Sequence, residues 1–87
     1  MDKQYYFFLW VKSDCSFCVE AEQELNNNDC RYTVYVMDND AEALQAIKDE
    51  FDWQTVPLVL VQCSDGERKF IGGCSDLKQY LKVINDG

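Results

Sequence analysis

The chain has 87 residues, a net charge of −8, no histidine and 47% hydrophobic residues. That length suits one small domain, the apolar content excludes a disordered chain, and no apolar run approaches the roughly 18 residues that span a bilayer. The acidic balance argues against nucleic acid as a partner, and an odd count of five cysteines argues against a fully paired secreted framework. We therefore expect a single domain over residues 1–87 in the reducing cytoplasm, bound to neither nucleic acid nor membrane.

Seven segments with the periodicity of secondary structure follow one another along the chain. Runs of β-branched and aromatic residues predict strands, and apolar residues three and four apart predict helices. Strand, helix and strand at the start imply a parallel crossover, and the turn at Ser64-Asp65-Gly66 predicts a hairpin. The pattern favours an α/β fold, βαβαββα, with a mixed four-stranded sheet flanked by helices. The expected segments are strand 4–11, helix 15–26, strand 31–37, helix 40–51, strand 58–61, strand 67–71 and a last helix that contains residues 77–84.

The first apolar run shows no alternation, which is typical of a central strand covered on both faces. Its aromatic residues are therefore expected in the core, namely Tyr5, Tyr6, Phe7, Phe8 and Trp10. Polar residues at the ends of the helices predict caps. The expected caps are Ser13 or Asp14 before the first helix, a left-handed Asn within 26–28 after it, one of residues 38–40 before the second helix and Ser75 before the third.

Cys15 and Cys18 stand where the first strand gives way to the first helix. A helix N-terminus favours an anion, so it lowers the pKa of a thiol and favours the reactive thiolate. Cys18 lies one turn further along the same face, within reach of a disulfide with Cys15. The first hypothesis is a redox dithiol. A structural zinc site is the alternative, but zinc usually takes four Cys or His ligands and the chain offers no histidine and no second close cysteine pair.

Three further cysteines have more ordinary interpretations. Cys63 falls in a predicted strand and is expected to be a small buried residue. Cys30 is expected to be structural or exposed in a loop. Cys74 stands beside a predicted ligand site, where a backbone contact is favoured over a redox role. Trp53 is left open between a partner-facing aromatic residue and a packing residue.

Three motifs occur in one order along this chain: Cys15-Ser16-Phe17-Cys18, Thr55-Val56-Pro57 and Gly72-Gly73-Cys74-Ser75-Asp76. Together they resemble the glutaredoxin family of the thioredoxin-like fold, over nearly the whole length. The resemblance implies a cis Val56–Pro57 bond and a Val56 backbone that pairs with glutathione as an added strand. It also implies that Lys12 serves the glycine carboxylate of glutathione or the thiolate. The remaining residues expected at the glutathione site are Phe17, Gln54, Thr55, Gly73, Cys74, Ser75 and Asp76.

Each part of the last motif has its own chemistry. Glycines at 72 and 73 allow close approach of the backbone to a ligand, and the N–H groups of Cys74 and Ser75 at a helix start can hold a carboxylate. Asp76 can take an ammonium group. These charges match the two charged groups of a γ-glutamyl end.

The activity implied by the resemblance is thiol–disulfide exchange by a monomer with glutathione as cosubstrate. The Cys15 thiolate attacks a disulfide, and either Cys18 or glutathione resolves the mixed disulfide. Clients would be glutathionylated and disulfide-bonded proteins, with ribonucleotide reductase one client class implied by the family. Ser16 is associated in the family with a [2Fe–2S] cluster held between two subunits by glutathione and Cys15 of each, so an iron–sulfur scaffold or carrier is the second hypothesis. A thioredoxin-like reductase or a non-catalytic binding module is the third.

Overall fold

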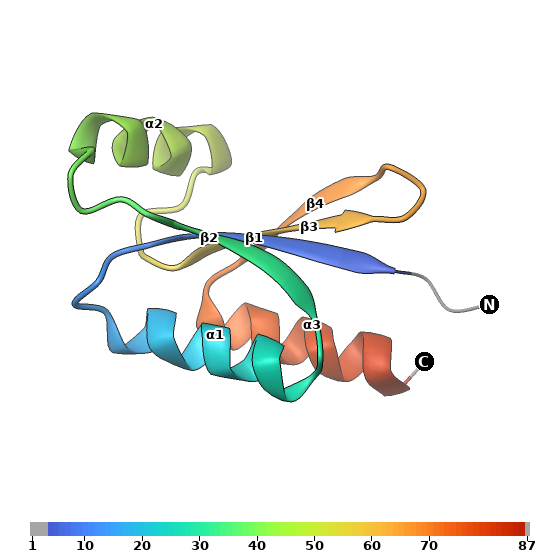
Figure 1. The fold of residues 1–87 in the computed structure, drawn as a ribbon. Helices are drawn as coiled ribbons and strands as arrows, with labels where there is room; N and C mark the ends of the chain where they lie inside the picture. The colour runs from blue at the N-terminus through green and yellow to red at the C-terminus, as the bar shows by residue number, and fades with distance from the viewer. Residues whose placement is uncertain (1–3, 87) are drawn as a thin grey trace.

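The computed structural model describes residues 4–86 as one mixed sheet with helices on both faces (Figure 1). The strand order is β2-β1-β3-β4, in which β1 pairs parallel with β2 and antiparallel with β3, and β3 and β4 form the predicted hairpin. The predicted order of elements is confirmed. The elements are β1 (Tyr5–Val11), α1 (Ser16–Asn27), β2 (Arg31–Val36), α2 (Ala41–Phe51), β3 (Leu58–Cys63), β4 (Arg68–Gly72) and α3 (Cys74–Asp86).

The helices are distributed unequally over the sheet. In Figure 1, α1 and α3 lie side by side against one face, and α2 lies on the other. The main core fills the first of these layers, because both helices present apolar stripes to the sheet. Its members are Phe7, Leu9, Val11, Cys18, Ala21, Leu25, Val59, Val61, Cys74, Leu77 and Leu81. None of the helices within the described part of the chain has the length and apolar content required to cross a membrane.

β1 is central, as predicted, but its side chains alternate between the two faces. Phe7 is fully buried against α1 and α3, whereas Tyr6 on the other face is 37% exposed. The prediction that all the aromatic residues of this strand lie in the core was therefore wrong for Tyr6. The physical reason is that a single helix, α2, covers the second face. An alternating strand with an aromatic solvent side resembles a strand covered on both sides when only the sequence is read.

The layer under α2 is built from aromatic rings. Trp10 stacks on Tyr35 with ring centroids 5.6 Å apart, and Phe51 of α2 stacks on Phe70 at 4.6 Å. Trp53 meets Phe70 edge-on at 5.7 Å. These contacts fix α2 on the sheet and hold the segment that follows it, which leads into β3.

The helix ends differ from the predicted caps at the start and end of α1 and at the start of α3. Cys15, rather than Ser13 or Asp14, is the N-cap of α1. After α1 the left-handed residue is Asp29, with φ of 54°, and not one of the asparagines. Asp40 caps α2 as one of the three residues predicted for that role, through Ala43 N–H.

Ser75 is not a cap, because α3 already begins at Cys74. Gly73 takes that position, since its carbonyl accepts the Leu77 N–H at 3.0 Å. The Asp76 carboxylate accepts the Gly73 N–H, also at 3.0 Å, and so closes the helix start. Of the predicted residues around this turn, the one that satisfies a backbone donor is therefore Asp76.

Candidate active site

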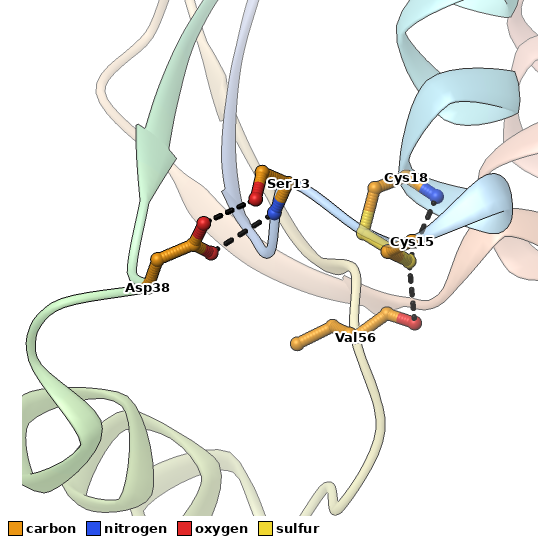
Figure 2. The surroundings of a disulfide bond; sticks show 5 residues. All are labelled: Ser13, Cys15, Cys18, Asp38 and Val56. Atoms are coloured by element: carbon orange, nitrogen blue, oxygen red, sulfur yellow. Dashed lines mark hydrogen bonds between the residues drawn. A yellow bond between two sulfur atoms is a disulfide. The ribbon is translucent and has the colours of Figure 1, made fainter.

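Cys15 and Cys18 form a disulfide at the beginning of α1, with their Cα atoms 5.2 Å apart (Figure 2). Cys15 precedes the first helical residue in an extended conformation, and its sulfur accepts the Cys18 N–H at 3.1 Å. Cys15 is partly exposed, whereas Cys18 is 1% exposed and belongs to the core. The burial separates two roles: a reagent from solvent can reach Cys15, and Cys18 can reach only the sulfur of Cys15.

The loop before Cys15 is anchored by a contact that the sequence analysis missed. The Ser13 N–H donates to Asp38 at 2.9 Å, and the Ser13 hydroxyl donates to the other oxygen of the same carboxylate (Figure 2). These donors hold the pKa of Asp38 below its usual range, and the nearby Lys12 ammonium lowers this pKa further. The available signal was topological, because the carboxyl ends of the parallel strands β1 and β2 must meet at one edge of the sheet.

The segment before β3 reaches the disulfide from the other side. The Val56–Pro57 bond is cis, as the family resemblance implied, and the Val56 carbonyl oxygen lies 3.8 Å from the Cys15 sulfur (Figure 2). Gln54 and Thr55 are exposed on this segment, and the amide of Gln54 lies 3.5 Å from that of Gln45. The structure thus brings Val56 and Pro57 to Cys15, with Thr55 and Gln54 next to them at the surface.

Two glycines, Gly72 and Gly73, join β4 to α3, and they differ in whether a side chain could be accommodated. Gly72 has φ of +126°, and a Cβ there would lie 2.6 Å from the Asp76 carboxylate oxygen. Gly73 has no such conflict, because a Cβ would meet its nearest neighbours at 3.6 Å or more. Gly72 is therefore required by the fold. Ser75 and Asp76 are exposed at the first turn of α3, where backbone N–H groups favour an anion.

Cys74 is buried and its thiol faces a carboxylate. Its sulfur lies 3.7 Å from Glu20, which also forms an ion pair with Lys78. Burial first, and then the charge of Glu20, raise the pKa of the Cys74 thiol. A protonated, buried thiol is a poor nucleophile, which supports the predicted backbone contact over a redox role.

Two more predicted residues lie at the surface of the site. Phe17, within the cysteine motif, is 62% exposed and can form an apolar wall for a ligand or client. Lys12 is exposed, and its ammonium group lowers the pKa of Asp38. Their roles toward glutathione stay predictions.

The sequence left open whether Trp53 faces a partner or packs in the core. Its ring lies against Gly73, and its Nε1 is buried with no hydrogen-bond partner among the described residues. Nothing in the local sequence places an indole from the α2–β3 connection against a glycine twenty residues later.

The remaining cysteines lie at the opposite end of the sheet. Cys63 pairs with Tyr5 across β1 and β3 and is partly buried, rather than buried as expected. Cys30 precedes β2, and burial raises the pKa of its thiol. Both line a broad depression whose lining residues do not include Cys15. Among the side chains that the structure describes, there is no group of three or more His, Cys, Asp or Glu that could hold a metal ion.

Comparisons with known proteins agree with this geometry. The chain matches the family model described as Glutaredoxin over residues 7–64, and a comparison with curated protein sequences gives no significant match. The dithiolic glutaredoxin 2-C-Grx1 from Trypanosoma brucei brucei is 31% identical, with a TM-score of 0.70 over 88% of this chain and 77% of that one. Oxidised glutaredoxin 2 from Chlamydomonas reinhardtii is 28% identical, with a TM-score of 0.68 over 88% of this chain and 71% of that one.

A third solved structure covers almost all of both chains. Glutaredoxin 1 from Francisella tularensis, solved with cacodylate, is 22% identical, with a TM-score of 0.73 over 95% of this chain and 99% of that one. At this identity the likeness concerns the fold alone. The predicted thioredoxin-like α/β fold is confirmed.

Proposed function

Because the chain belongs to the glutaredoxin family, we propose that this thiol–disulfide oxidoreductase depends on glutathione and works through Cys15 and Cys18. The observation that carries the proposal is the position of Cys15. It caps α1 with its sulfur, is open to solvent, and lies 3.8 Å from the Val56 carbonyl oxygen in the segment expected to bind glutathione. A solved maleylacetoacetate isomerase from Anaeromyxobacter dehalogenans, which is 14% identical and similar in fold over 38% of its length with a TM-score of 0.61, has glutathione bound in its active site.

The reaction follows from the unequal burial of the two thiols. The reduced Cys15 is favoured as a thiolate by the N-terminus of α1. It attacks one sulfur of a client disulfide, the client S–S bond breaks, and the departing client thiolate takes a proton from water. Cys18 then attacks the Cys15 sulfur, which releases the second client thiol and forms the Cys15–Cys18 disulfide. Two glutathione molecules return the pair to the dithiol and leave as glutathione disulfide.

Glutathionylated clients need a shorter route. Attack of Cys15 on the glutathione sulfur leaves the client as a thiol and the enzyme as a glutathione mixed disulfide. A second glutathione resolves this intermediate without Cys18. In the proposed binding mode the peptide lies along the Val56 backbone as an added strand, and its γ-glutamyl carboxylate lies at the start of α3 near Ser75. Lys12, Phe17, Gln54, Thr55 and Asp76 are the proposed side-chain contacts.

Cys→Ser variants test this scheme. Cys15→Ser should abolish glutathione-dependent reduction of a glutathionylated peptide, because no other exposed thiol borders the site. Cys18→Ser should keep much of that activity and lose the reduction of a protein disulfide. Cys63→Ser, at the far end of the sheet, is the matched control and should behave as the unmodified chain. Undiminished turnover by Cys15→Ser, or turnover that needs a thioredoxin reductase instead of glutathione, would contradict the proposal.

A shared [2Fe–2S] cluster is the second candidate. Since Cys18 is buried, Cys15 is the thiol of the motif that can reach iron outside its own chain, and Cys15 of two chains with two glutathione thiols would complete four ligands. Visible absorbance and a dimer in freshly prepared protein, both lost in Cys15→Ser, would support the cluster. A colourless monomer would support the reductase, acting in the reducing cytoplasm on disulfide clients such as ribonucleotide reductase.

A further inference from the structure

The indole of Trp53 carries a polar group that the fold does not satisfy. Its Nε1 is buried and has no hydrogen-bond partner within the described part of the chain. Most buried donors in folded proteins are paired, because leaving one unpaired costs the desolvation of that group. A phenylalanine would fill the same wall without this cost. Packing therefore explains the ring of Trp53 but not its N–H.

The surroundings of the N–H indicate what it could bind. A Cβ built on Gly73 would lie 3.6 Å from Trp53 Cζ2, 3.8 Å from Nε1 and 3.7 Å from the Pro57 carbonyl oxygen. The indole N–H thus borders a narrow space over Gly73, which a single methyl group would fill at ordinary contact distances. That space adjoins the start of α3, a 13-residue helix whose first N–H groups favour an anion.

We propose that Trp53 determines the specificity for glutathione by donating its indole N–H to the α-carboxylate of the γ-glutamyl residue. This inference rests on the proposed function and names a contact within that same site. A carboxylate is favoured over a neutral oxygen because the indole donor and the N-terminus of α3 both stabilise negative charge. Because the N–H is covered in the free chain, the proposed contact requires the ring to turn away from Gly73 as the carboxylate enters. The edge-on contact with Phe70, at 5.7 Å, supports the other side of the ring.

Trp53→Phe is the direct test, because it keeps an aromatic wall and removes the donor. The expected result is a rise of about tenfold in the KM for glutathionylated peptide, the effect of losing a hydrogen bond to a charged group. The loss should fall on KM rather than on kcat. Trp10→Phe is the matched control: it makes the same substitution in the same aromatic layer, where Trp10 stacks on Tyr35. It should leave KM unchanged.

A second substrate separates recognition from packing. The same peptide carrying Cys-Gly instead of glutathione lacks the γ-glutamyl residue, so Trp53→Phe should not change its KM. An equal rise with both substrates would overturn the inference and leave Trp53 as a packing residue. A KM within about twofold of the unmodified value on the glutathione substrate would also overturn it.

A third variant and a spectrum do not depend on Trp53→Phe folding well. Gly73→Ala puts a methyl group into the space beside the N–H without a clash and should raise the same KM. In Cys18→Ser, formation of the glutathione mixed disulfide should shift the Trp53 indole proton downfield. An unmoved indole resonance would refute the contact even if glutathione turnover is normal. Absence of that turnover in the unmodified chain would instead refute the proposed function.

Discussion

Gly72 and Gly73 are neighbours for which the structure predicts opposite results of the same substitution. In Gly72→Ala the new methyl carbon would lie 2.6 Å from the Asp76 carboxylate oxygen, on a backbone with φ of +126°. The unfavourable backbone costs about 1–3 kcal/mol, and the overpacking adds about 1–3 kcal/mol. Displacing Asp76 also weakens its hydrogen bond to the Gly73 N–H. We expect a loss of about 3–5 kcal/mol, a large share of the roughly 4–13 kcal/mol that a chain of this length has.

Gly73→Ala is the internal control for this reasoning. Its Cβ would make ordinary contacts of 3.6–3.8 Å, so strain is not expected. Alanine is a poorer N-cap than glycine but reduces the entropy of the unfolded chain, and these effects oppose each other. The free energy of unfolding should therefore change by less than about 1 kcal/mol.

Equilibrium urea unfolding measures both variants, with the Cys15–Cys18 pair fully reduced so that a single transition is followed. Adding Asp76→Ala to Gly72→Ala removes the clashing carboxylate and should recover the overpacking part of the loss, but not the backbone strain. Equal unfolding midpoints for Gly72→Ala and Gly73→Ala would refute the conclusion that the fold requires glycine at position 72 but not at position 73.

Two predictions concern pH. Hydrogen bonds from Ser13 lower the pKa of Asp38, so the ionised carboxylate stabilises the fold above its ordinary pKa, and this contribution disappears as pH falls through the lowered value. Asp38→Asn should lower the thermal midpoint by a few degrees at neutral pH and leave it unchanged in strong acid; an equal decrease at both would contradict the assignment. Burial and then Cys63 raise the pKa of Tyr80 to about 12, so the fold should lose stability as pH rises from about 10 to 12. Ultraviolet titration should show tyrosine ionisation near pH 12 that is absent in Tyr80→Phe, and identical titration curves of the two proteins would exclude the shift.

The order of strands and helices was predictable because each element carries its own local pattern. The caps were less predictable, because an N-cap depends on which side-chain acceptor is free to take a helix N–H. Ser13 is a better N-cap by type than cysteine, yet its hydroxyl donates to Asp38 in the turn after β2, and the Cys15 sulfur accepts the helix N–H instead. The exposure of Tyr6 likewise depends on how much of the sheet α2 covers, which no window of sequence contains.

The candidate site shows the same division between local and distant information. The cysteine pair and the cis-proline segment could be located from the sequence, because each is a short contiguous motif of the family. The contact of Trp53 with Gly73 could not, because it joins the α2–β3 connection to the β4–α3 turn through space. The Ser13–Asp38 contact is of the same kind, and both lie beside residues that the motifs had already identified.

If the proposed scheme holds, the burial of the thiols decides how its two routes compete. A client can form its mixed disulfide at Cys15, while Cys18 is 1% exposed and the Cys74 thiol is kept protonated by burial and Glu20. Attack by Cys18 is intramolecular across a Cα separation of 5.2 Å, so it does not depend on concentration, whereas attack by glutathione does. Raising glutathione should therefore shift mixed disulfides toward the route that needs Cys15 alone. The balance between protein disulfides and glutathionylated clients then follows from the glutathione supply, with no change in the fold.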